Sequence, residues 1–320
     1  MRFGHLLGIG IICLTIFSQA GYSADVQEKP AYLFSYFTGN GEDGLHLAYS
    51  LDGLEWKSLN NEKSLLTPAV GGKLMRDPCV LRGSDGLFHM VWTAGWWERG
   101  IGYASSKDLI TWSQQKYIPV MEHEATAQNS WAPEVVYDPD EKQYMIFWAT
   151  TIPGRFPATE NTGDRNHRIY YITTKDFETF SPAKVLLDPG FNSIDATIVW
   201  ADGHYVMFIK NESKTPPEKN IRVCTADKPT GPWGPASKPI TGKYWAEGPT
   251  TIQIGEWWYV YFDKYMERKY GVIRSKDFVN WEDLSEQLHY PKGLRHGTVF
   301  AVEPTVLKKR LNLNPNPDTN

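Results

Sequence analysis

A short turn sequence recurs five times along this chain, each time just after a stretch of alternating residues. Every copy combines Ser, Thr, Asp or Gly residues and ends on a bulky aromatic side chain. The closing aromatics recur roughly every 50 to 70 residues, a period typical of propellers and other repeat architectures. A propeller gathers one inner strand from each blade around a central axis, so polar residues distant in sequence converge there. The copies span residues 48–56, 103–112, 171–180, 223–233 and 272–281.

An aromatic-rich segment precedes each of these turns. β-branched and aromatic residues bounded by Gly, Asp and Pro are typical of β-strands. The Asp of each turn can accept hydrogen bonds from backbone amides, and the aromatic that follows can pack between neighbouring blades. No amphipathic helix of normal length stands out. The sequence therefore predicts an all-β fold, a five-bladed β-propeller.

The first residues indicate export. Arg2 and His5 precede an apolar run at residues 6–17, and small residues follow at 18–20. This pattern is typical of a secretory signal peptide, and it is too short to span a membrane as a mature helix. We expect a signal peptide at residues 1–20, with cleavage as late as residue 24, and a periplasmic or secreted product. An uncleaved membrane anchor is the alternative.

The remaining chain has the length of one large β domain. We expect a single propeller at residues 31–306 and a C-terminal tail at residues 307–320. The formal net charge of −4 argues against a nucleic-acid partner. We also expect no membrane association after signal cleavage, and a monomer. Only Cys79 and Cys224 remain in the mature chain, and a count of two leaves their pairing open.

Acidic residues stand at comparable points of several repeats. Asp77, Asp195 and Glu247 each directly precede the first apolar strand of a blade, and Glu134 occupies the same place in another. Acids at equivalent points of different blades should face one another across the axis. Their mutual repulsion raises at least one pKa and leaves another group ionised. Glycoside hydrolysis needs that division, because one acid protonates the leaving oxygen and one base activates water.

Five short motifs, taken in order, resemble those of glycoside hydrolase family 43. The resemblance covers the chain from about residue 31 to about residue 306. It implies a five-bladed β-propeller that removes arabinofuranosyl, xylosyl or galactosyl units with inversion of the anomeric centre. The motifs are Arg-Asp-Pro at 76–78, Trp-Ala-Pro-Glu at 131–134, Ser-Ile-Asp-Ala at 193–196, Glu-Gly-Pro at 247–249 and Arg-His-Gly-Thr-Val at 295–299.

The resemblance also implies catalytic roles for three carboxylates. Asp77 corresponds to the general base, Asp195 to the residue that modulates a pKa, and Glu247 to the general acid. Asp195 is expected to lie near Glu247 and to keep it protonated by charge repulsion. An inverting site should hold the carboxyl groups of Asp77 and Glu247 roughly 6.5–9.5 Å apart.

The chain departs from the family pattern at two points. Ala196 follows Asp195, where Pro is more usual, and a full repeat precedes Asp77. The second departure makes Asp43 or Asp52 the alternative base. Both are interpreted as turn residues, because they sit amid Gly and precede no Pro-led strand.

Other residues are expected to line the sugar pocket. Trp96, Trp97 and Trp131 are candidate walls for stacking a sugar ring, and a core role is the alternative for each. Glu134 is interpreted as a substrate-side or structural acid. Arg295 is expected to orient the substrate or to hold the base ionised, because a nearby cation lowers a carboxylate pKa.

His296 has two interpretations. In family 43, a histidine of the last blade often lies at the axis and binds a metal, usually calcium, largely through waters. Calcium prefers oxygen ligands, so a histidine that hydrogen-bonds the acids or the sugar is the alternative. One structural or axial calcium is therefore an open expectation, and no organic cofactor is expected.

The leading functional hypothesis is an exo-acting, inverting glycoside hydrolase. Its substrates would be side chains of plant or microbial polysaccharides or oligosaccharides, with α-L-arabinofuranosidase as the best single assignment. β-Xylosidase and exo-β-galactosidase are alternatives, because the family does not fix the sugar. A non-catalytic glycan-binding propeller is the alternative of another class. A sialidase is excluded by too few blades and by the lack of a recognisable arginine triad with a tyrosine nucleophile.

Overall fold

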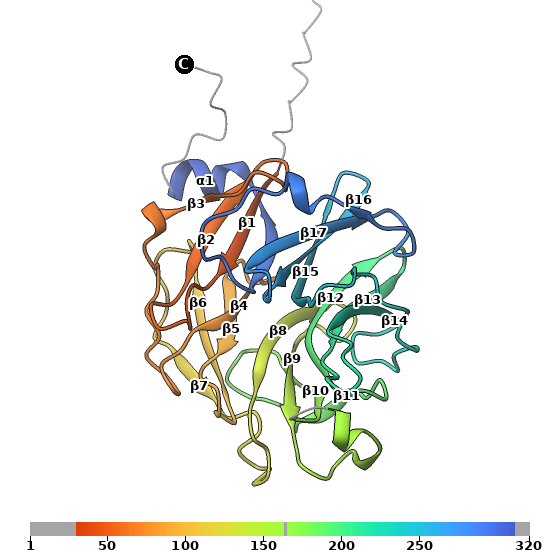
Figure 1. Cartoon of the computed structure of the whole chain (residues 1–320). Coiled ribbons are helices and arrows are strands. Elements are labelled where there is room, and N and C mark those ends of the chain that lie inside the picture. The colour runs from red at the N-terminus through yellow and green to blue at the C-terminus, as the bar shows by residue number, and fades with distance from the viewer. Residues whose placement is uncertain (1–29, 163–164, 311–320) are drawn as a thin grey trace, which may run out of the picture.

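Five antiparallel sheets surround a central axis in the computed structural model (Figure 1). The structure describes residues 30–162 and 165–310. The first blade runs in the order β19 (Thr298–Val302), β1 (Ala31–Tyr36), β2 (His46–Ser50) and β3 (Lys57–Ser58). The second contains β4 (Arg76–Arg82), β5 (Phe88–Thr93), β6 (Ile101–Ser106) and β7 (Lys116–Ile118).

The other three blades follow in chain order. The third contains β8 (Trp131–Asp138), β9 (Gln143–Thr151), β10 (His167–Thr174) and β11 (Lys184–Leu187). The fourth contains β12 (Ser193–Ala201), β13 (His204–Asn211) and β14 (Asn220–Ala226). The fifth contains β15 (Glu247–Ile254), β16 (Trp257–Lys264), β17 (Lys269–Ser275) and β18 (Glu282–Asp283). The predicted five-bladed, all-β propeller is confirmed.

Both ends of the described chain build the first blade. Strand β19 pairs with β1, with Ala31 opposite Val302, so the last strand closes the ring against the first. A short helix, α1 (Pro304–Arg310), follows β19, and its Leu307 is fully buried in the cluster between the first two blades. The packed part of the chain thus extends past residue 306. The predicted signal peptide at residues 1–20 and the tail beyond residue 310 lie outside the described residues.

The recurring aspartate turns form as the sequence predicts in four of the five copies. The carboxylate of Asp52 accepts hydrogen bonds from the backbone N–H groups of Leu54 and Glu55 at 2.8 and 2.9 Å. Asp108, Asp176 and Asp277 accept the same pair of bonds in their own turns. The fourth copy has Ala226 where the others have Ser or Thr, and among the described hydrogen bonds its aspartate has none of this kind.

Five hydrophobic clusters fill the spaces between neighbouring blades, one at each interface. Trp56, which closes the first aspartate turn, packs edge-on against Tyr261 of the fifth blade, with ring centroids 5.7 Å apart. The predicted packing of the turn aromatics between blades is confirmed there. Cys79 and Cys224 are buried, unpaired and in different clusters. None of the helices in residues 30–162 and 165–310 has the length and hydrophobicity needed for a membrane span.

Candidate active site

The inner strands of the second to fifth blades share an irregularity at their first residues. In each, the register with the next strand shifts by way of a bulge. One residue of every bulge has a positive φ, namely Asp77 (51°), Ala132 (46°), Asp195 (52°) and Gly248 (59°). Bulges re-aim side chains, and left-handed backbone at a non-glycine residue is a strain that proteins concentrate at functional sites.

These bulges correct the alignment of the acids inferred from sequence. Asp77 and Asp195 do occupy equivalent positions, but Glu134 lies two residues after its bulge residue, Ala132, and Glu247 lies one residue before Gly248. The four acids are therefore not one repeated feature. Of these four, Asp77, Asp195 and Glu247 line the same cavity, and Glu134 does not.

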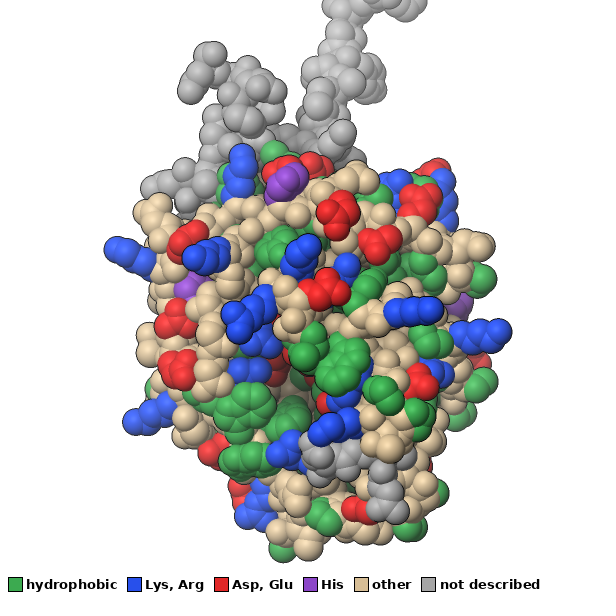
Figure 2. Space-filling model, in the orientation of Figure 1, with side chains coloured by type: hydrophobic (Ala, Val, Ile, Leu, Met, Phe, Trp, Pro, Cys, Tyr) green, Lys and Arg blue, Asp and Glu red, His purple; other side chains and the backbone are tan. Residues whose placement is uncertain are grey.

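That cavity has a volume of about 390 Å³ and opens at the bulged ends of the inner strands. Figure 2 shows a hollow near the centre of the molecule, rimmed by hydrophobic and basic side chains. The lining includes several residues singled out in the sequence: Asp77, Trp96, Trp131, Asp195, Glu247, Arg295 and His296.

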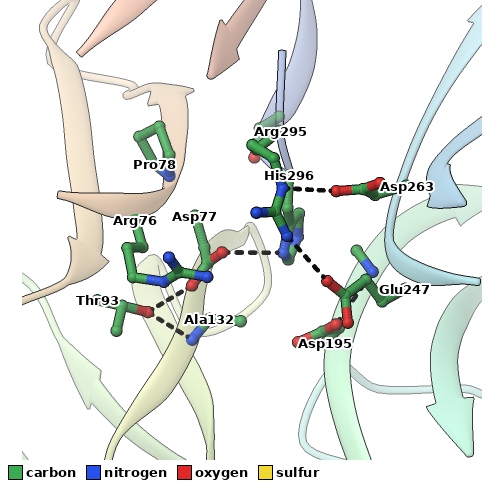
Figure 3. A network of polar contacts seen from close by, with 12 residues as sticks. Arg76, Asp77, Pro78, Thr93, Ala132, Asp195, Glu247, Asp263, Arg295 and His296 are labelled. Atoms are coloured by element: carbon green, nitrogen blue, oxygen red, sulfur yellow. Dashed lines mark hydrogen bonds and ion pairs between the residues drawn. The ribbon is translucent and has the colours of Figure 1, made fainter. Parts of the chain in front are cut away.

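Asp77 is held as a carboxylate by its neighbours. One oxygen accepts a hydrogen bond from the hydroxyl of Thr93 at 2.7 Å, and the other lies 3.3 Å from Nδ1 of His296 (Figure 3). Burial alone would raise the pKa of Asp77, but the hydrogen bond and charge of His296, together with Arg76, hold that pKa below its ordinary value. An ionised carboxylate at this position has the protonation state that a general base requires.

The alternative bases lie elsewhere. Asp43 accepts a bond from His46 at 2.7 Å, and Asp52 is committed to its turn. Neither lines the cavity that holds Asp77.

Asp195 lies beside Glu247. Its Oδ2 accepts a hydrogen bond from the backbone N–H of Gly248 at 3.0 Å. Burial is the main cause that raises the pKa of Asp195 to about 6, with the nearby charges of Glu247 and Asp77 acting in the same direction. Asp77 lies on the opposite side of His296 from Asp195 and Glu247 (Figure 3). The sequence led to the expectation that neighbouring acids in the pocket have unequal pKa values. Asp77 and Asp195 differ in this way, because the pKa of Asp77 is lowered and that of Asp195 is raised.

Glu247 differs from expectation. Its Oε2 accepts a hydrogen bond from Nζ of Lys210 at 2.9 Å, and its Oε1 lies 3.4 Å from Arg295. Burial would raise the pKa of Glu247, but these two cations and His296 lower it. The effect of Asp195, which was expected to keep Glu247 protonated, is therefore outweighed in the free protein. The cause is Lys210, a buried lysine that the sequence reasoning missed.

One feature of the sequence could have identified Lys210 as a residue of the site. Lys210 is a charged residue near the end of β13, directly after a run of apolar and aromatic residues at 205–209, and its exposed fraction is 1%. Lysine is rarely buried without a charged partner. Here Nζ also contacts Glu212 at 2.6 Å, and the neighbouring carboxylates overcome burial and raise the pKa of Lys210.

His296 lies at the centre of the acids. Burial would lower its pKa, but contact with Asp77 and the charges of Asp195 and Glu134 raise it to about 9. A Cβ atom on Gly248 would come 2.4 Å from Cγ of the His296 ring, so only glycine allows the two elements to approach this closely. Arg295, the preceding residue, donates a hydrogen bond from Nε to Asp263 at 2.8 Å.

A directly bound calcium does not fit these residues. The described part of the chain contains no group of three or more His, Cys, Asp or Glu side chains arranged to hold a metal ion. Nδ1 of His296 faces Asp77, and calcium prefers six to eight oxygen ligands. An axial calcium held through waters stays a prediction.

The three candidate tryptophans and Glu134 differ in whether they line the cavity. Trp96 and Trp131 line the cavity, and Nε1 of Trp131 donates a hydrogen bond to the carbonyl of Trp96 at 2.8 Å. Trp97 is 60% exposed and lies outside the lining, against Trp131. Glu134 also lies outside the lining; it is buried, and burial with the charge of Asp195 raises its pKa to about 8.

Several lining residues were not predicted from sequence. Arg76 stands in the Arg-Asp-Pro motif itself, so the motif could have revealed it. The others have no local signal, because strands and loops of different blades bring them to the cavity. The lining residues with polar or charged side chains that were not predicted are Asn40, Arg76, Thr93, Arg165 and Glu212.

A curated protein is similar in sequence to part of this chain. A curated α-L-arabinofuranosidase from Bifidobacterium longum subsp. longum is 26% identical over 247 residues, covering 64% of this chain and 23% of that protein. This chain therefore spans less than a quarter of that relative's length.

Solved structures share the fold. An α-L-arabinofuranosidase from Lactobacillus brevis superposes with a TM-score of 0.52 at 17% identity, covering 66% of this chain and 72% of that one. The Bacteroides ovatus xyloglucan PUL GH43B protein gives 0.51 at 18% identity, covering 69% and 42%. An exo-β-1,3-galactanase from Phanerochaete chrysosporium gives 0.52 at 12% identity, covering 69% and 52%.

Residues 28–305 match the model of the glycosyl hydrolase 43-related family, described as "Probable glycosyl hydrolase domain". The match includes all five blades and every residue placed at the cavity above. The chain belongs to the glycosyl hydrolase 43-related family.

Proposed function

We propose that this protein is an exo-acting, inverting glycoside hydrolase that removes α-L-arabinofuranosyl units from side chains of polysaccharides or oligosaccharides. The observation that carries the proposal is the meeting of Asp77, Asp195 and Glu247 in one cavity, with the pKa of Asp77 lowered and that of Asp195 raised. A binding site alone does not require carboxylates of unequal pKa. The cavity volume lies near the lower end of the range for small-molecule sites, about 300–1,000 Å³, which favours a terminal sugar.

In the proposed reaction, Asp77 takes a proton from the attacking water. Thr93 and His296 orient its two oxygens. Glu247 donates a proton to the leaving oxygen from the other side of the site. Because Lys210 and Arg295 favour the ionised form of Glu247, the active form is a minority that grows as pH falls. We therefore expect an acidic pH optimum.

β-Xylosidase and exo-β-galactosidase activities are the alternatives within the family. The sugar depends on contacts that residues of different blades make with hydroxyl groups, and family membership does not fix them. A non-catalytic glycan-binding propeller is the alternative of another class. It predicts tight binding without turnover.

A panel of nitrophenyl glycosides tests the proposal. We expect fastest release from the α-L-arabinofuranoside, with inversion seen by proton NMR of the first-formed sugar. Faster release from the β-xyloside or β-galactoside would replace the assigned sugar. Net retention would remove the inverting assignment and the role of Asp77. No turnover of any glycoside, with binding retained, would favour the non-catalytic alternative.

Three further properties belong to the proposal. Export to the periplasm or medium rests on residues 1–20 and is tested by fractionating cells that express the chain with and without them. A monomer is tested by light scattering. Assays with EDTA, followed by added calcium, test whether an axial calcium contributes: a loss restored by calcium would support it, and unchanged activity would remove it.

A further inference from the structure

Two arginine and three tryptophan side chains stack on one another at one side of the cavity. The guanidinium of Arg76 lies 4.3 Å from the ring centroid of Trp96, and that of Arg165 lies 4.5 Å from Trp97 and 5.3 Å from Trp131. Trp96 and Trp131 meet edge-on with centroids 5.6 Å apart. These five residues, here called the arginine–tryptophan wall, come from the second and third blades and the loops beside them.

The two arginines of the wall differ in pairing from the third arginine of the cavity. Arg295 is engaged with Asp263 and Glu247. Within residues 30–162 and 165–310, no carboxylate forms a salt bridge with Arg76 or Arg165. Arg76 instead donates a hydrogen bond to the side-chain oxygen of Asn40 at 3.2 Å.

A purely structural stack has a different arrangement elsewhere in the molecule. Arg274 lies 4.2 Å from the ring centroid of Trp257, and its guanidinium is paired with Glu282 at 2.8 Å. There the aromatic face and the carboxylate together satisfy the cation. In the wall the aromatic faces are present, but among the described residues no carboxylate forms a salt bridge with either arginine, although the charge of Arg76 lowers the pKa of nearby Asp77. Stacking fixes the guanidinium plane and leaves its N–H edge available for a planar acceptor.

The depth of the wall determines which sugar it can contact. Trp96 is 41% exposed and Trp97 is 60% exposed, whereas Asp195 is 7% exposed. The wall therefore stands at the mouth of the cavity, and the reacting carboxylates stand at its base. An anionic group on the terminal sugar would face those carboxylates and be repelled. An anionic group one sugar further out would face Arg165, which stacks on Trp97 and Trp131, whereas Arg76 lies beside Asp77 (Figure 3).

We propose that the arginine–tryptophan wall binds an anionic group on the sugar next to the one released, so that the preferred substrates are acidic glycans. The planar guanidinium fork matches a carboxylate, which identifies a uronic acid as the expected sugar. A sulfate ester on a neutral sugar presents related chemistry. This inference rests on the proposed function, because it assigns the leaving-group side of the same site.

Matched oligosaccharides test the inference. One carries the terminal arabinofuranosyl unit on a uronic acid, the second carries it on the carboxyl-reduced neutral sugar, and the third carries it on the sulfated neutral sugar. We expect kcat/KM for the uronate to exceed that for the neutral compound by about 10-fold or more, as for one charge-assisted contact. The excess should shrink with added salt, because the wall is exposed. A larger preference for the sulfated compound would replace the uronate as the ligand.

The Arg165→Gln variant should reduce the ratio of acidic to neutral kcat/KM to about 3-fold or less, and Arg165→Lys should retain part of it. The matched control is Arg274→Gln, which also removes an arginine from a tryptophan face and should keep the full ratio. The ratio of acidic to neutral kcat/KM is taken within each variant, because a general loss of activity lowers both values equally and leaves the ratio unchanged. A wild-type ratio near one, or an unchanged ratio in Arg165→Gln, would overturn the inference.

Calorimetry with the Glu247→Gln protein gives a readout that needs no turnover. Tighter binding of the uronate than of the neutral oligosaccharide, lost when Arg165→Gln is added, supports the wall even if the wild type hydrolyses neither compound. If the wild type hydrolyses aryl glycosides but the Glu247→Gln protein binds the acidic and neutral oligosaccharides equally well, this inference is wrong and the proposed function still stands.

Discussion

Replacing Lys210 by Met should move the alkaline limb of the pH–rate profile to higher pH. Nζ of Lys210 lies 2.9 Å from Oε2 of Glu247 and is the strongest influence that lowers the pKa of that carboxyl. Removing the cation favours the protonated form of Glu247, which the proposed reaction uses. The alkaline limb of kcat/KM reports the acid of the free enzyme, so the limb follows the pKa of Glu247 upward.

The magnitude follows from the geometry of the ion pair. Two unit charges about 4 Å apart interact by about 4 kcal/mol at an effective dielectric constant of about 20. Arg295 and His296 remain near Glu247 in the variant and continue to lower its pKa. A displacement of the limb by one pH unit corresponds to about 1.4 kcal/mol. Losing less than half of the interaction energy between Lys210 and Glu247 is therefore enough to move the limb by one unit. We expect a displacement of at least about one unit.

The assay is kcat/KM against pH for an aryl glycoside, with the melting temperature recorded for each variant. Lys210→Met breaks a buried pair, which costs roughly 3–5 kcal/mol of stability, so folding must be verified. Lys210→Arg keeps the charge and should keep the limb near its wild-type position. Lys276→Met, which removes a surface lysine paired with exposed Glu256, is the matched control and should leave the limb unchanged.

An alkaline limb that stays in place in folded Lys210→Met would refute the reasoning. It would mean that Glu247 is not the group titrating in that limb, or that Lys210 does not control it. A limb that moves equally in Lys210→Arg would assign the effect to altered packing instead of charge.

Four other changes test the site. Glu247→Gln should slow hydrolysis of substrates with poor leaving groups by about 10²–10⁴-fold and spare activated aryl glycosides in part, and equal losses on both would count against Glu247 as the acid. Asp77→Asn should abolish turnover of both substrate types; azide rescue with a product of inverted configuration would mark a base rather than a nucleophile. Because the pKa of Asp195 is about 6 and that of Glu247 is lowered, Asp195 is already protonated where Glu247 titrates; Asp195→Asn should therefore leave the alkaline limb in place, and a limb that moves to lower pH would show that a charged Asp195 keeps Glu247 protonated. Gly248→Ala forces a Cβ at positive φ to within 2.4 Å of His296 and should lower stability by more than about 1 kcal/mol, so an unchanged melting temperature would contradict the close approach.

The repeat pattern of the sequence was sufficient to predict the propeller. Each of the four aspartate turns that form is a local structure whose hydrogen bonds join residues two or three positions apart, as at Asp52 and Asp277. Such contacts depend on neighbouring residues alone, so they can be read without the fold. The motifs around Asp77, Asp195 and Glu247 then placed three acids at the inner ends of strands that a propeller must bring together.

Only the tertiary structure decided how those acids are charged. Lys210 is 37 residues from Glu247 in the chain and belongs to the neighbouring blade, yet the two side chains form a hydrogen bond. The bulges decided a further point, because they direct Asp77, Asp195 and Glu247 into the cavity and leave Glu134 buried outside its lining. A pKa depends on charges within a few ångströms and on burial, and both are set where separate blades meet. The sequence therefore determined which acids meet in the cavity, and the packing of the blades determined the direction in which their pKa values shift.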